Sequence, residues 1–96
     1  MGKRPAITVA EIEAKTAAFE KALALFEGER ARLVATRTAE NVHEVRYAIG
    51  LAAKSVKTAH GELFWLLNEI SLGVRVEGEV PDDLQERAEK AAEWHE

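Results

Sequence analysis

Two groups of side chains in this sequence could carry out chemistry, and both lie near the middle of the chain. In the first group, Glu40 and His43 are three residues apart, a spacing that places a carboxylate and an imidazole on one face of a helix. This spacing is half of the metal site in carboxylate-bridged di-iron bundles. Such a site also needs an inward glutamate from the facing helix, where this sequence offers Arg32, Leu33 and Arg37. We therefore predict an exposed histidine near a turn, with no metal and no other cofactor.

Arginines form the second group. Arg30 and Arg37 fall on the stripe of one expected helix, and Arg46 lies near them across the expected turn. Arginines that are half-buried together can bind a small carboxylate or phosphate, because the guanidinium fork matches such anions. In size and architecture the chain resembles short all-helical chorismate mutases, dimers whose arginines line a site in the bundle, although no run of residues matches that family's pattern. We favour a simpler interpretation, in which the arginines lay their stems over apolar neighbours and reach acids such as Glu29.

The composition is that of one small globular domain. The chain has 96 residues, of which 47% are hydrophobic and 31% charged. There is no cysteine, which excludes disulfides, thiolate metal sites and a cysteine nucleophile. The formal net charge is -4, and the acids gather in the last quarter of the chain, which disfavours nucleic acid as a partner. No apolar run is as long as a membrane span and no signal-peptide core is present, so we expect no membrane partner and a cytoplasmic protein.

Two long runs of the sequence carry a heptad pattern. Mainly apolar residues recur from 9 to 37 and from 42 to 70, at steps that alternate between three and four. The pattern predicts two long helices, each with one stripe that faces another helix. Thr8 and Glu11 form a capping box, so the first helix is expected over residues 9–37, with a break at Gly28 as the alternative. Residues 1–8 ahead of it are expected to be a mobile basic arm.

The two stripes are out of phase between Arg37 and Val42, which predicts a turn. Thr38 is a suitable N-cap, so the second helix is expected over residues 39–72. The two helices then form an antiparallel hairpin over residues 9–72.

The hairpin can be checked by pairing residues about the turn. Phe19 then faces Ala59, and Phe26 faces Ala52. Large side chains opposite small ones are what a close-packed seam requires, so the pairing supports the hairpin.

The last quarter of the chain predicts a connector and a third helix. Gly73 is placed to end the second helix, and residues 74–80 alternate apolar and charged side chains, which indicates an extended segment or short strand within the connector 73–81. Asp82 or Asp83 then caps a helix expected over residues 82–94, within the acidic segment 82–96. Its thin apolar stripe consists of Leu84, Ala88, Ala91 and Trp94.

The second helix has more apolar surface than one stripe uses. The excess residues, which we predict to form an interface, are Tyr47, Leu51, Phe64, Trp65 and Leu72. For the cluster of Phe64, Trp65, Leu67 and Leu72 two outcomes remain open, because the third helix could fold back over it. An interface there would join two copies of the chain into a four-helix bundle or a larger oligomer.

The predicted fold class is therefore all-α, a long antiparallel hairpin with a short C-terminal helix. The predicted function is a non-enzymatic helical interaction module that binds itself or another protein, as a small regulator, inhibitor or assembly adaptor of bacterial or phage type. The alternative is a small helical-bundle enzyme or metal-binding protein, with a site lined by Arg30, Arg37 and Arg46 or by Glu40 and His43.

Overall fold

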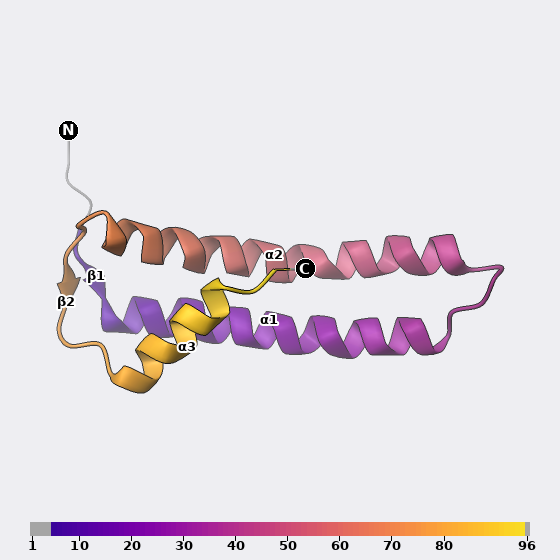
Figure 1. Cartoon of the computed structure of the whole chain (residues 1–96), viewed down its shortest axis with the longest axis horizontal. Coiled ribbons are helices and arrows are strands. Elements are labelled where there is room, and N and C mark those ends of the chain that lie inside the picture. The colour runs from indigo at the N-terminus through magenta and orange to yellow at the C-terminus, as the bar shows by residue number, and fades with distance from the viewer. Residues whose placement is uncertain (1–4, 96) are drawn as a thin grey trace.

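The computed structural model describes residues 5–95 of the chain. Helices α1 (Val9–Ala35) and α2 (Val42–Ser71) form a long antiparallel hairpin, and the short helix α3 (Asp82–Ala92) lies across one half of it (Figure 1). The predicted all-α hairpin with a C-terminal helix is confirmed, whereas its assembly into a larger bundle stays a prediction. None of the helices in this part of the chain has the length and apolar composition needed to cross a membrane.

Helix α1 begins at the predicted cap and runs without a break past Gly28. The hydroxyl of Thr8 accepts a hydrogen bond from the backbone N–H of Glu11 at 3.0 Å, the first half of the capping box. The helix ends at Ala35, two residues before the predicted end, because the Thr36 hydroxyl donates to the Leu33 carbonyl and closes the last turn.

The turn between the helices is longer than predicted. The Thr38 hydroxyl accepts from the backbone N–H of Asn41 at 3.2 Å, the bond that a cap makes, but the Asn41 side chain closes a loop by accepting from the N–H of Thr38 and donating to the carbonyl of Thr36. These reciprocal bonds satisfy the loop's own backbone, so the chain stays in a turn until Asn41. Helix α2 therefore starts at Val42 and not at residue 39.

The register of the hairpin agrees with the predicted pairing. Phe19 lies against His60, the neighbour of its predicted partner Ala59, with ring centroids 6.0 Å apart. Phe26 and Ala52 line the same groove between the helices. The core along this seam consists of Ile12, Thr16, Phe19, Phe26, Val45, Ala53, Val56, Leu63 and Leu66.

The end of the predicted mobile arm is part of the fold. Strand β1 (Ile7–Thr8) pairs in parallel with β2 (Val76–Glu77), and Ile7 is completely buried. The backbone N–H of Ile7 also donates to the carbonyl of Arg75 at 2.9 Å. The prediction of mobility was wrong for Ile7 and Thr8. Their backbone groups pair with those of the connector strand, and the apolar side chain of Ile7 is buried in the core. The basic residues Lys3 and Arg4 lie outside the described residues.

The end of α2 and the apolar stripe of α3 agree with the sequence, whereas the ends of α3 differ from those predicted. Gly73 has a φ of 103°, and the N–H groups of Gly73 and Val74 donate to the carbonyls of Ile70 and Glu69, which is the predicted C-terminal glycine cap. The N-cap residue of α3 is Pro81 and not the predicted aspartate, since Asp82 is already the first residue of the helix. The helix ends at Ala92, two residues before the predicted end. Its predicted stripe is confirmed, since Leu84, Ala88 and Ala91 are buried and Trp94 packs against the core.

One core position is polar, and its replacement should stabilise the protein. Thr16 is fully buried, and its hydroxyl has no hydrogen-bond partner among residues 5–95. Valine has nearly the same shape without the hydroxyl, so Thr16→Val should raise the free energy of unfolding by about 1–3 kcal/mol. Urea unfolding measures this change. A variant less stable than the parent would show that the hydroxyl has a partner.

Candidate interaction surface

The side of α2 that faces away from α1 carries large apolar side chains. Exposed fractions are 71% for Tyr47, 45% for Leu51, 63% for Trp65 and 77% for Leu72. Helical spacing places these four residues along one line, opposite the buried stripe of Val56 and Leu63. We call them the outer α2 face. Large apolar side chains that share one exposed side of a helix are typical of a binding site for another molecule.

The outer α2 face belongs to a second heptad pattern on α2, which we call the second seam. Between its large residues lie Lys54, Thr58, Gly61 and Asn68, and the steps from residue 47 to residue 72 alternate between four and three. Gly61 adds space, because a Cβ built there would meet nothing within 4 Å. Sequence reasoning found the large residues and missed the small and polar ones between them, although the same alternation that revealed the buried stripe would have found them.

Helix α3 does not cover this surface. Trp65 and Leu72 remain exposed, whereas Leu67 packs partly buried against the core, so the cluster left open by the sequence is divided between core and surface. Phe64 sits on the border, 48% exposed, with its ring stacked on His60 at 6.0 Å and edge-on to Trp65 at 6.2 Å. Phe64 therefore connects Trp65 of the outer α2 face to the partly buried His60.

An aromatic cluster fastens the end of α3 to the hairpin. His60 lies between Phe19 and Trp94, with centroids 6.0 and 5.6 Å away, and its Nε2 is hydrogen-bonded to the carbonyl of Ala92 at 2.8 Å. Phe19 also meets Trp94 edge-on at 5.9 Å. All three helices contribute to this cluster, which fixes α3 on the side of the hairpin and leaves the outer α2 face free.

Arg87 of α3 bridges two glutamates of α1. Its guanidinium donates to Glu20 at 2.7 and 3.1 Å and to Glu13 at 3.1 and 3.3 Å. The hydrogen bonds from Arg87 lower the pKa of Glu20 below its ordinary value of 4.5 and raise the pKa of Arg87. Since the three side chains are 36% to 49% exposed, solvent screens the pairing and its contribution to stability is small.

The bridge between Arg87 and Glu20 predicts that the free energy of unfolding depends on pH, and the lowered pKa of Glu20 determines the direction of the change. A carboxylate with a lowered pKa stabilises the folded state above its ordinary pKa, and this stabilisation is lost as the pH falls through the lowered value. Arg87→Gln should therefore be less stable than the parent at neutral pH, and the difference should vanish in acid. Urea unfolding at both pH values measures it. Arg37→Gln, an exposed arginine in the turn region, is the control, and an equal pH dependence in both variants would contradict the assignment.

The predicted anion-binding arginines lie on the surface. Arg30, Arg37 and Arg46 are all exposed, so the half-buried cluster that anion binding would use is not formed. The guanidinium carbon of Arg30 lies 5.5 Å from the ring centroid of Phe26, which is the predicted packing of an arginine over an apolar neighbour. Glu29 is bound by Arg32 at 2.6 Å and not by these three residues.

The weak metal candidates are also separated by the longer turn. Glu40 belongs to the turn and His43 to the first turn of α2, so the predicted helical spacing of the pair is absent, and both side chains are exposed. In the described part of the chain, no group of three or more histidine, aspartate and glutamate side chains could hold a metal ion.

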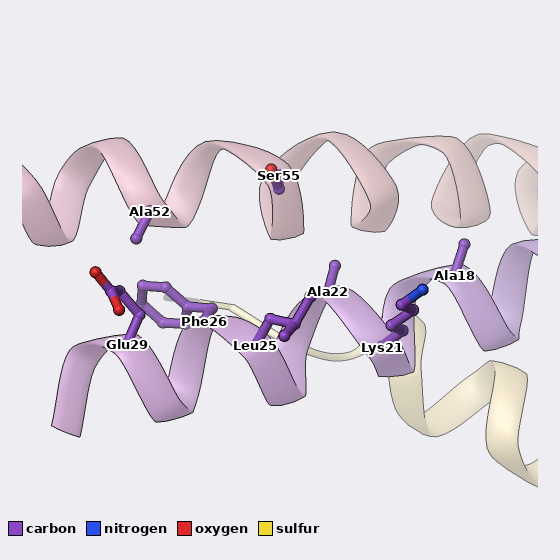
Figure 2. Close-up of a pocket in the computed structure, with 8 residues that line it drawn as sticks. All are labelled: Ala18, Lys21, Ala22, Leu25, Phe26, Glu29, Ala52 and Ser55. Atoms are coloured by element: carbon purple, nitrogen blue, oxygen red, sulfur yellow. The ribbon is translucent and has the colours of Figure 1, made fainter. Parts of the chain in front are cut away.

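A shallow hollow lies between α1 and α2. It is a groove of about 480 Å³ that is lined by α1 and α2, and half of its lining residues are alanine or serine (Figure 2). Ala18 and Ala22 point from α1 toward α2, and Ala52 points from α2 toward Phe26. Glu29 and Lys21 stand at its edge, but the lining holds no pair of groups arranged as nucleophile and base.

The geometry of the described residues therefore offers one feature that points to a function, the outer α2 face. The groove, the exposed arginines and the turn carboxylate each lack a second group that would complete a site. Comparison of the chain with protein-family models, curated proteins and solved structures finds no match.

Proposed function

We propose that this protein is a non-enzymatic helical interaction module that binds a protein partner through the outer α2 face. The observation that carries the proposal is the exposure of Tyr47, Trp65 and Leu72 in one line, on the side of α2 that the fold does not use. Aromatic side chains supply large contact areas at low entropic cost, which makes such residues effective anchors in interfaces. A small cytoplasmic regulator, inhibitor or assembly adaptor would use a surface of this kind.

The proposal predicts that Trp65 serves binding and not folding. Trp65→Glu should change the free energy of unfolding by no more than about 0.5 kcal/mol, because the side chain is mostly exposed. Leu63→Ala, a buried position on the opposite side of α2, should lose about 2–5 kcal/mol in the same urea titration. If Trp65→Glu unfolds the protein as severely as Leu63→Ala, then Trp65 belongs to the core and the proposal is wrong.

Site-specific photo-crosslinking tests the binding surface itself. A benzophenone amino acid replaces Trp65 in cells that naturally produce the protein, and the matched control carries it at Leu25 of α1. The two positions are equally accessible, with exposed fractions of 63% and 66%. Covalent adducts of defined mass should form from position 65 and not from position 25. Adducts at neither position, or the same adducts at both, would contradict a specific surface.

The enzyme or metal-binding alternative gains no comparable observation among residues 5–95. The arginines it requires are exposed and apart from any enclosed cavity, and Glu40 is displaced from the helix that carries His43.

A further inference from the structure

We infer that the outer α2 face binds a second copy of this chain in antiparallel orientation, with α2 of each copy along α2 of the other. The inference rests on the proposed function and names the occupant of the same surface. It is carried by the order of large, small and charged residues along the second seam. When two copies of the seam run in opposite directions, small residues meet at the centre and Lys54 of each copy meets Trp65 of the other.

The antiparallel pairing gives every position of the seam a facing residue in the other copy. When the two α2 helices are centred between Thr58 and Gly61, Thr58 of each copy faces Gly61 of the other, and the small residues at the centre let the backbones approach. Moving outward, Leu51 faces Asn68, Lys54 faces Trp65, and Tyr47 faces Leu72. All four large apolar residues of the face are used, and no large residue meets its own copy.

The position of Lys54 selects the antiparallel orientation. In an in-register parallel pair, Lys54 would face Lys54, and like charges opposite each other in a seam oppose pairing. Trp65 would meet Trp65 in the same arrangement, while Gly61 would face Gly61 and leave a void. In the antiparallel pair the ammonium of Lys54 lies over the Trp65 ring of the other copy, a favourable contact between a cation and an aromatic face.

The flanks of the seam do not oppose the antiparallel pairing. Glu62 and Glu69 lie along one flank, where they meet Ser55 and Ala48 of the other copy. Glu62 is already paired with Lys15 of its own chain at 2.9 Å, so it does not require a partner across the contact. Lys57 lies along the other flank and meets Phe64 of the other copy. No like charges face each other directly on either side.

The size of the contact predicts a weak, reversible dimer. From residue 47 to residue 72 the seam is about 38 Å long at 1.5 Å per residue. The four large side chains expose roughly 100 Å² each, so two copies bury roughly 800 Å² from these side chains alone. The residues between them bring the total toward the roughly 1,200 Å² at which specific interfaces begin. The dimer should therefore form and dissociate with protein concentration.

The orientation is tested by disulfide formation between two variants. The chain has no cysteine, so each introduced thiol is the only one in its molecule. Leu51→Cys and Asn68→Cys are mixed in equal amounts and oxidised gently. The antiparallel pairing sets these positions opposite each other, while two copies of position 51 lie about 25 Å apart along the helix axis. The mixed disulfide should exceed its statistical share, and neither variant alone should form a covalent dimer.

Sedimentation of the uncrosslinked protein over a range of concentrations completes the test. Trp65→Glu should raise the dissociation constant about thirtyfold or more, as expected for a central aromatic anchor, and should abolish the mixed disulfide when added to both cysteine variants. Leu25→Glu on α1 is the control and should leave association unchanged. Dominant disulfides between identical positions would establish a parallel pair and overturn the inference. A chain that stays monomeric at every concentration would also overturn it, and adducts from position 65 to a different protein would then leave the proposed function standing.

Discussion

Replacing Phe19 with alanine should lower the free energy of unfolding by about 3–5 kcal/mol, the range for a buried aromatic truncated to alanine. A domain of this size has a total stability of roughly 5–15 kcal/mol, so the variant will lose a large part of it. Phe19 is 2% exposed and its ring contacts His60 of α2 and Trp94 beyond α3. The cavity would therefore open where all three helices meet. Urea unfolding followed by circular dichroism measures the loss.

Phe64→Ala is the matched control for Phe19→Ala. It removes the same side chain from the same aromatic cluster, but Phe64 is 48% exposed and leaves no enclosed cavity. Its cost should stay below about 1.5 kcal/mol, because it loses two partly exposed ring contacts, with His60 and Trp65, and no buried volume. Equal losses in the two variants would mean that ring contacts with His60, and not burial, determine the stability of this region.

Replacing Ile7 with alanine should cost about 2–5 kcal/mol, although this residue lies only two positions before the first helix. Ile7 is completely buried, and both its side chain and its backbone N–H are used, the latter by the carbonyl of Arg75. A mobile arm would give no change. Val34→Ala at an exposed aliphatic position is the control and should be neutral or slightly stabilising, because alanine is the better helix former. If Ile7→Ala were equally neutral, β1 would contribute nothing to the fold.

The hairpin could be predicted from the sequence because its determinants are local and periodic. The alternation of three and four residues specifies which side of each helix is buried, and the match of Phe26 with Ala52 specifies the register. The pairing of Ile7 with Val76 could not be predicted in this way. Alternating residues show that a segment can form a strand, but they carry no information about which distant segment will pair with it.

Two further differences have equally specific causes. Thr38 and Asn41 are both good capping residues, and only the closed geometry of the turn decides that they bond to each other and leave Glu40 outside the helix. The position of α3 depends on the rings of Phe19 in α1, His60 in α2 and Trp94 just beyond α3, and no helical period reveals that these three rings meet. For the surface, the large residues of the outer α2 face were visible in the sequence. The burial of Leu67 could not be predicted, because it depends on Val76 and Val80 of the connector and on Gln85 of α3, which line the same hollow.

The pairing of β1 with β2 also has a consequence for how the molecule opens. The strand pair ties Ile7 and Thr8, which directly precede α1, to the connector that leads into α3. Helix α3 has its own attachments to the hairpin through Trp94 and Arg87, so loss of the strand pair would detach β1 and leave α3 in place. The resulting partly open form would expose Ile7 while the three helices stay packed together.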